Sequence, residues 1–299
     1  MTQIRHNDTM MRSSLRGFID QSGIKSVVEI IAQSSTIGAE VRGLDISVGL
    51  SDQQFEQVNQ AFLDYQIIFF RDQQLSPQQY NDFALRFGQL KDYLFVDGID
   101  GFPFITEIVK TETETESFGN FWHSDSAYME LPPKITMLYA RQIPAQGGDT
   151  LFADMYAAYD ELSPGLKATL ERLNAVNSAS VVPRDEDFYA AVKSKNSDKR
   201  DQSAIHPVIR SHDETGKKSL YVNSIHTLGF EGMTLEESLP LLSYLYEQVT
   251  RPEYSFRLRW AENTLAMWDN RCTQHYALND YHGHRRVMHR IIVEGEHPK

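Results

Sequence analysis

Residues 121–125 read Phe-Trp-His-Ser-Asp, so that His123 and Asp125 lie two positions apart. Residues two apart in an extended chain project from the same face, and this imidazole and this carboxylate can therefore reach one metal ion. A third imidazole would complete the two-histidine, one-carboxylate arrangement that leaves open positions on Fe(II) for a co-substrate and dioxygen. Because the chain has ten histidines, such a triplet arises easily by chance, and by itself it is a weak indication.

A second stretch, near the C-terminus, strengthens the prediction of a metal site at His123 and Asp125. It contains His275, and eleven residues later Arg286 stands on a segment that is predicted to be a strand. Arg286 and Arg290 are four residues apart, so in a strand they share a face with Met288 between them. Two arginines that face a barrel interior would be costly to bury unpaired, whereas carboxylates match the guanidinium fork bidentately. The pattern predicts that bound anions complete this face.

Composition and charge exclude several classes of protein. With 41% hydrophobic and 23% charged residues, the chain is not collagenous, coiled-coil or wholly disordered. Its net charge of −12 opposes a nucleic-acid surface, which works by neutralising phosphates. The lone Cys272 excludes a disulfide framework and a multi-cysteine zinc site. We expect a cytoplasmic protein that does not engage a membrane, because no segment approaches the roughly 20 apolar residues of a membrane span.

Hydrophobic periodicity predicts helices near the N-terminus and strands beyond them. Ser51–Gln54 and Ser76-Pro77 have the pattern of two helix starts, with a buried strand expected at 67–70 between the helices. Farther along, helices at about 154–173 and 235–248 interrupt strands expected at 103–109, 135–141, 205–211, 219–223, 254–259, 264–268 and 285–293. Strands without regularly alternating helices favour a sandwich or barrel with appended helices over a doubly wound sheet.

We expect one catalytic domain over residues 26–299. Residues 1–25 are polar and show no sustained period, which predicts a flexible N-terminal extension. Residues 184–203 are dense in Lys, Asp, Ser and Glu, which predicts a mobile insertion and not a linker between domains. The acidic run at 111–116 belongs either to a lid over the substrate or to a solvated loop.

Several motifs, in order along the chain, closely resemble the taurine dioxygenase and phenoxyacetate-herbicide dioxygenase family. The resemblance runs from about Ile37 to Pro298, and its motifs are Gln66–Asp72, Phe87-Gly88, Trp122–Asp125, Pro132-Pro133, Gly147–Thr150, His206–Val208, Trp268–Arg271, Thr273–Tyr276 and Arg285–Arg290. The members of this family are Fe(II)- and 2-oxoglutarate-dependent oxygenases with a double-stranded β-helix, or jelly-roll, fold. The resemblance therefore implies a mainly β protein with a jelly-roll core and appended helices.

The resemblance also implies roles for individual residues. Carried over position by position, the family pattern makes His123, Asp125 and His275 the iron ligands. It places Thr150 and Arg286 on the distal carboxylate of 2-oxoglutarate. The implied cofactors are Fe(II), with 2-oxoglutarate and O2 as co-substrates.

Departures from the family pattern bear on the primary substrate, whose anionic group the resemblance places at Arg290. Where the taurine enzymes carry a histidine and a tyrosine that help to grip the sulfonate, residues 91–96 read Lys-Asp-Tyr-Leu-Phe-Val. Gly119 stands where the taurine enzymes have an asparagine. Taurine is therefore not the expected substrate, and we expect a different pocket, defined in part by Tyr93, Ser126, Tyr128 and His226.

The implied reaction hydroxylates a small anionic substrate, such as a sulfonate, sulfate ester, aryloxyalkanoate or other carboxylate, and releases succinate and CO2. Two alternatives are a metal-dependent hydrolase and a non-catalytic ligand-binding module on the same barrel. The hydrolase would need a general acid or base near bound water, and it leaves Arg286 unexplained. The intact triplet of His123, Asp125 and His275 argues against the module. Because homo-oligomers are common among relatives, we expect a homo-oligomer.

Overall fold

The computed structural model describes residues 28–93, 96–179 and 202–299. The expected N-terminal extension over 1–25 lies outside the described residues, as does nearly all of the expected insertion at 184–203. Within the described part of the chain, no helix is both long enough and apolar enough to cross a membrane.

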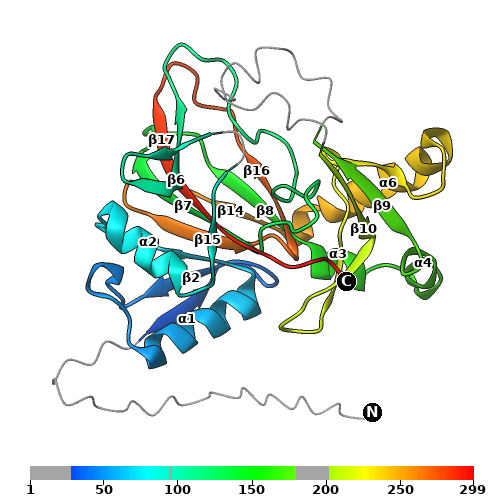
Figure 1. The fold of residues 1–299 in the computed structure, drawn as a ribbon, viewed down its shortest axis with the longest axis horizontal. Coiled ribbons are helices and arrows are strands. Elements are labelled where there is room, and N and C mark those ends of the chain that lie inside the picture. The colour runs from blue at the N-terminus through cyan, green and yellow to red at the C-terminus, as the bar shows by residue number, and fades with distance from the viewer. Residues whose placement is uncertain (1–27, 94–95, 180–201) are drawn as a thin grey trace, which may run out of the picture.

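The strands gather in the middle of the molecule and helices flank them (Figure 1). Helices α1 (Asp52–Tyr65) and α2 (Pro77–Leu85) lie on one side, and α4 (Pro164–Leu170) and α6 (Leu235–Val249) lie on the other. The shorter helical segments are α3 (Met155–Asp160), η1 (Ile46–Val48) and η3 (Pro252–Tyr254). This arrangement confirms the expected mainly β protein with appended helices.

The largest sheet holds nine strands. They are β1 (Glu29–Ala32), β2 (Ala39–Arg42), β3 (Ile67–Phe70), β4 (Leu90–Lys91), β5 (Gly98–Ile99), β6 (Phe102–Lys110), β7 (Ile135–Gln142), β15 (Leu265–Asp269) and β17 (Arg286–Val293). The order is β1-β2-β3-β15-β7-β17-β6-β5, with β4 pairing β17 off this path. Among the described strands of this sheet, only β2 and β3 run parallel, so the topology is not that of a doubly wound sheet.

A smaller sheet faces the large one across a shared core. It has the order β14-β8-β16, with β8 (Thr150–Asp154), β14 (Ser255–Leu258) and β16 (Thr273–Ala277). Phe152 and Phe256 from this sheet pack in one buried cluster with Phe69, Trp268 and Met288 from the large sheet. Two antiparallel layers that bury such a cluster between them are the arrangement of a jelly roll.

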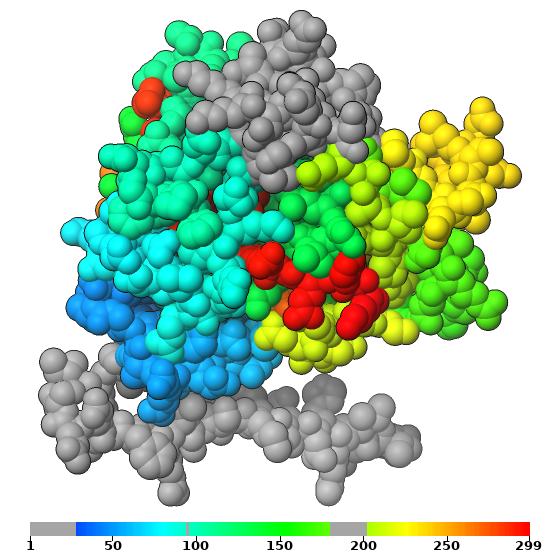
Figure 2. Space-filling view, viewed as in Figure 1, coloured from blue at the N-terminus to red at the C-terminus, as the bar shows by residue number. Residues whose placement is uncertain are grey.

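The remaining strands extend the body on the side of α4 and α6. One sheet has the order β10-β9-β13, and a two-stranded ribbon pairs β11 with β12; the strands are β9 (Asn174–Ser178), β10 (Ser203–Pro207), β13 (Thr227–Phe230), β11 (Ile209–Ser211) and β12 (Lys218–Leu220). The C-terminus packs beside this ribbon, because the Ser211 N–H donates to the Lys299 carbonyl at 2.5 Å. Figure 2 shows these last residues, in red, at the surface beside the yellow segment.

Both predicted helix starts near the N-terminus are confirmed. The Ser51 hydroxyl accepts from the Gln54 N–H at 3.3 Å, and the Gln54 side chain accepts from the Ser51 N–H at 2.9 Å. Ser76 and Gln79 form the same reciprocal pair, with Pro77 at the first helical position. The helices bury one face each on the large sheet, with the side chains of Val58, Ala61, Phe62, Tyr80, Phe83 and Ala84.

Three expectations about secondary structure are wrong in detail. The helix expected over 154–173 is two helices, because the Ser163 side chain caps a new helix start, with Pro164 at the first position of α4. Ser203, expected within the mobile insertion, begins strand β10. The strand expected over 205–211 divides at Val208 into β10 and β11, which pair with different partners. None of these differences affects the residues proposed to carry chemistry.

Candidate active site

The three expected metal ligands converge on one point. His123 and His275 face each other across an antiparallel bridge, in which each backbone N–H donates to the other residue's carbonyl, at 3.1 and 2.8 Å. Their ring centroids are 4.1 Å apart, and His123 Nε2 lies 3.7 Å from Asp125 Oδ1. One ligand atom from each of the three side chains lies within 4.8 Å of the others, and all three residues are buried. The structure therefore brings together the triplet that the sequence predicts.

The surroundings of the two imidazoles prepare them to bind a cation. His123 Nδ1 lies 2.8 Å from the Phe121 carbonyl, an oxygen that only accepts, so Nδ1 carries the proton and Nε2 keeps its lone pair. The His275 ring packs against Trp268, with centroids 4.7 Å apart. Burial and the neighbouring His123 hold the pKa of His275 well below its usual range, so this imidazole is neutral near pH 7. Neutral imidazole is the form that binds metals.

A chain of hydrogen bonds orients the carboxylate of Asp125. Thr136 donates its hydroxyl proton to Asp125 Oδ2 at 2.5 Å, and Asn270 Nδ2 donates to the Thr136 hydroxyl at 2.9 Å. The Asn270 carbonyl oxygen accepts from Trp268 Nε1 at 3.1 Å. The carboxylate is thus held by a buried and connected network, which is the type of support that fixes metal ligands.

Charge keeps Asp125 ionised. Burial by itself raises the pKa of this carboxyl, but the Arg290 guanidinium, with Nη2 at 3.0 Å from Oδ1, and the hydrogen bond from Thr136 hold the pKa well below its usual range. An ionised carboxylate beside two imidazoles is a ligand set that suits Fe(II), and it would leave positions on a bound ion free for the reactants. The residues present therefore fit the metal that the sequence implies.

Thr150 and Arg286 line the same cavity as the three ligands. The Thr150 hydroxyl accepts from Trp260 Nε1 at 2.9 Å, so its own proton can be donated to a ligand. Arg286 is buried, and among the described residues its Nε and Nη2 atoms have no hydrogen-bond partner of good geometry, although the Tyr281 hydroxyl lies near the guanidinium. Burial lowers the pKa of this guanidinium. A buried cation with two unused donors next to a hydroxyl fits a carboxylate, as 2-oxoglutarate would supply.

The two arginines share a face, as the sequence predicts. Along β17 the residues Arg286, Met288 and Arg290 are buried, whereas Val287 and His289 are half-buried. Arg290 lies close to the metal ligands through its ion pair with Asp125. Its guanidinium also lies over an aromatic ring, 4.6 Å from the ring centroid of Tyr93. Arg290 therefore places a positive charge next to the three predicted metal ligands.

The four residues expected in the substrate pocket lie around this region. Tyr93 contacts Arg290, the Ser126 hydroxyl donates to the Tyr128 hydroxyl at 3.4 Å, and the Tyr128 and His226 rings are 4.9 Å apart. The His226 ring is 6.4 Å from that of His123. Ser126, directly after the metal-binding motif, has φ = 50°, a strained conformation for serine of the kind that clusters at functional sites.

A second group of potential metal ligands has a structural role. His212, Asp269 and Cys272 are buried together. His212 Nδ1 accepts two backbone N–H groups from the loop that follows, each at 3.1 Å, so Nε2 carries the proton that is donated to Asp269 at 2.9 Å. Arg271 donates three hydrogen bonds to Asp269, two from its guanidinium at 2.8 and 2.7 Å and one from its backbone N–H at 2.9 Å. With both ring nitrogens of His212 engaged, this group offers no site for a metal.

Three residues of the site were not predicted from the sequence. Asn270 lies inside the motif at 268–271, which marks this segment as important but does not reveal that Asn270 supports Asp125. No sequence pattern marks Thr136, because threonine is common in strands. Lys110, which lines a cavity next to Arg286, is the last residue of β6, one position beyond the strand expected at 103–109.

Known proteins resemble the chain over most of its length. The model of the family "Taurine catabolism dioxygenase TauD, TfdA family" matches residues 29–292. The chain is 36% identical over 271 residues to an alkylsulfatase of Acinetobacter baylyi, and this alignment covers 87% of this chain and 83% of that protein. It is 33% identical over 268 residues to an alpha-ketoglutarate-dependent sulfate ester dioxygenase of Pseudomonas putida, and this alignment covers 88% of both chains.

Solved structures agree. A crystal structure of a taurine dioxygenase from Burkholderia xenovorans matches with a TM-score of 0.76 and 30% identity, covering 91% of this chain and 90% of that one. This likeness confirms the jelly-roll core, and the family match confirms the resemblance drawn from the motifs. The chain belongs to the taurine catabolism dioxygenase TauD, TfdA family.

Proposed function

We propose that residues 26–299 form one catalytic domain that uses Fe(II), 2-oxoglutarate and O2 to oxidise a small anionic substrate. The observation that carries the proposal is the convergence of His123, Asp125 and His275 in a buried cavity that also holds two arginines. Family membership supports the same reaction class. A hydrolase needs neither buried arginine, so this arrangement favours the oxygenase.

The protein's own residues bind and orient the reactants in this proposal. Bound Fe(II) supplies the dioxygen chemistry, in which one oxygen atom enters the substrate and the other enters succinate, with loss of CO2. Thr150 and Arg286 hold the distal carboxylate of 2-oxoglutarate. Arg290 faces the substrate anion while its ion pair keeps Asp125 charged. The side chains around the reacting atoms are buried, which would limit the access of water to them.

We propose sulfate esters as the first substrate class to test. Two of the similar proteins are named for alkyl sulfate or sulfate ester chemistry, and Arg290 offers the cation that a sulfate group needs. Hydroxylation of the carbon that bears the ester oxygen gives an unstable product that falls apart to an aldehyde and sulfate. Tyr93, Ser126, Tyr128 and His226 would shape the rest of the pocket.

A spectroscopic titration tests the reaction class. Anaerobic addition of Fe(II) and 2-oxoglutarate should give a weak visible charge-transfer band that is lost in His123→Ala. His297→Ala is the matched control, because this exposed histidine pairs with Glu130 at 3.2 Å, outside the site. A parent protein that gives no band contradicts the proposal. Succinate release over a panel of sulfate esters, sulfonates and aryloxyalkanoates then identifies the substrate class.

A further inference from the structure

Lys110 is a buried cation that forms no ion pair with the described residues. It is 4% exposed, and its Nζ has no hydrogen-bond partner in this part of the chain. The described residues give it no ion pair; the contact that it does make is with the ring of Tyr281, whose centroid is 4.6 Å from Nζ. Lysine is almost never fully buried unless it is paired. A charge in this position indicates that a ligand supplies the missing anion.

The register of the large sheet places Lys110 directly beside Arg286. The two residues are paired across β6 and β17, so their side chains leave the same face of the sheet. Like charges directly opposite each other on neighbouring strands are destabilising, with Cβ atoms only about 5 Å apart. Two donor atoms of Arg286 also have no hydrogen-bond partner within the described residues. One anion between the two side chains would relieve both problems.

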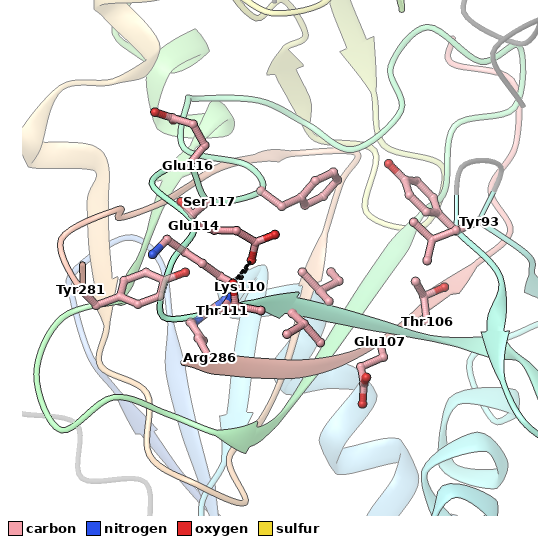
Figure 3. A pocket seen from close by; sticks show the side chains of 14 residues that line it. Tyr93, Thr106, Glu107, Lys110, Thr111, Glu114, Glu116, Ser117, Tyr281 and Arg286 are labelled. Atoms are coloured by element: carbon pink, nitrogen blue, oxygen red, sulfur yellow. Dashed lines mark hydrogen bonds between the residues drawn. The ribbon is translucent and has the colours of Figure 1, made fainter. Parts of the chain in front are cut away.

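A cavity of about 390 Å³ lies on the Lys110 side of Arg286. Arg286 also lines the separate cavity of Thr150 and the three metal ligands, so an anion held by Arg286 lies where the two cavities meet. Figure 3 shows Lys110, Tyr281 and Arg286 at one end of this cavity and Tyr93 at the other. The buried hydroxyl of Ser117, on the wall, lies near the Tyr281 hydroxyl. Glu114, which lines the same end, accepts from both the N–H and the hydroxyl of its neighbour Thr111, at 2.6 and 2.9 Å.

We propose that Lys110 is a second cation for the distal carboxylate of the 2-oxo acid, shared with Arg286. The inference rests on the proposed use of 2-oxoglutarate and adds a residue to that site. A carboxylate has about four lone-pair positions. The Thr150 hydroxyl, two donors of Arg286 and one of Lys110 would fill them. This arrangement selects a 2-oxo acid that ends in a carboxylate over one that ends in a methyl group.

Binding measurements with Mn(II) in place of Fe(II) test the role without turnover. Isothermal titration calorimetry compares 2-oxoglutarate with 2-oxovalerate, which has the same chain length but ends in a methyl group. In Lys110→Met we expect the Kd for 2-oxoglutarate to rise about tenfold or more, with the Kd for 2-oxovalerate unchanged. Lys110→Arg should retain most of the affinity. Lys218→Met is the control, since that lysine pairs with Glu171 at 2.8 Å on the surface.

Each other outcome has a definite meaning. Equal weakening of both acids in Lys110→Met, or no change in either, overturns the inference while leaving 2-oxoglutarate as the co-substrate. Inorganic phosphate that binds the parent protein together with 2-oxoglutarate, and is lost in Lys110→Met, would instead assign Lys110 to a separate anion and also overturns it. Failure of the parent protein to bind 2-oxoglutarate overturns the proposed function as well. Circular dichroism confirms that each variant is folded.

Discussion

Two buried arginines on one strand have opposite electrostatic surroundings. Burial lowers the pKa of both, but the neighbouring Asp125 reverses this at Arg290, whose pKa is raised. At Arg286 no carboxylate pairs with the guanidinium within the described residues, and the pKa stays lowered. The protein thus completes the metal end of the cavity by itself, and it leaves the other end for a bound anion to complete.

The largest expected effect is on the stability of the metal-free protein. Arg290→Met removes one partner of a buried ion pair and leaves Asp125 uncompensated, so we expect a loss of about 3 kcal/mol in the free energy of unfolding. Arg286→Met removes a cation that has no such partner, and we expect a change within about 1 kcal/mol or a gain. Urea unfolding in the presence of a chelator at pH 7 measures both. Equal losses of unfolding free energy in both variants would contradict the view that only Arg290 stabilises the metal-free protein through an ion pair.

Ligand binding should reverse the ranking. Arg286→Met should weaken 2-oxoglutarate binding by about 2 kcal/mol or more, because the distal carboxylate of 2-oxoglutarate then lacks the guanidinium that binds it. The primary substrate should be affected less. Arg290→Met should show the opposite preference. Calorimetry on the Mn(II) protein gives the first affinity, and the KM for the substrate found in the succinate assay gives the second. A reversed order would mean that the roles of the two arginines are exchanged.

The next largest effect should be a loss of metal affinity when the hydrogen bond that orients Asp125 is removed. Thr136→Val keeps the side-chain shape but removes the hydroxyl that donates to Asp125, and we expect Mn(II) affinity to fall about 10- to 100-fold. Thr264→Val is the matched control, because this buried threonine accepts from Arg71 at 2.9 Å, outside the cavity. Unchanged metal affinity in Thr136→Val would show that the network does not orient Asp125.

The smallest effect should come from the residue behind Thr150. Trp260→Phe removes the N–H that donates to the Thr150 hydroxyl while it keeps most of the ring. We expect 2-oxoglutarate affinity to fall by about 1 kcal/mol, the net value of one ordinary hydrogen bond. Calorimetry on the Mn(II) protein measures it. A loss as large as that of Arg286→Met would mean that Trp260 acts through packing and not through this bond.

The sequence predicted best those features that depend on neighbours in the chain. The capping residues Ser51 and Ser76 act over three positions, and the alternation from Arg286 to Arg290 is a local property of one strand. The metal ligands were predicted because the family resemblance joins His275 to a motif more than a hundred residues earlier. Local pattern alone could not supply that pairing.

Features that depend on pairing across the sheets were missed. Strands β8 and β16 are five residues each and mostly buried, so they lack the alternation that marks a strand with one solvated face. Lys110 reads as an ordinary lysine at the end of a strand, and only the register against β17 places it beside Arg286. Thr136 likewise has its role because of a contact with Asp125 that the fold creates.

The backbone bridge between His123 and His275 ties metal retention to local unfolding. The same two residues that would bind the ion also close a pair of N–H to carbonyl hydrogen bonds between the segment at 121–125 and β16. Opening that pair separates two ligands in one event, so a bound ion resists the opening. The two amide protons should therefore exchange with solvent more slowly in the metal-loaded protein, and chelation should first loosen this segment while the large sheet stays closed.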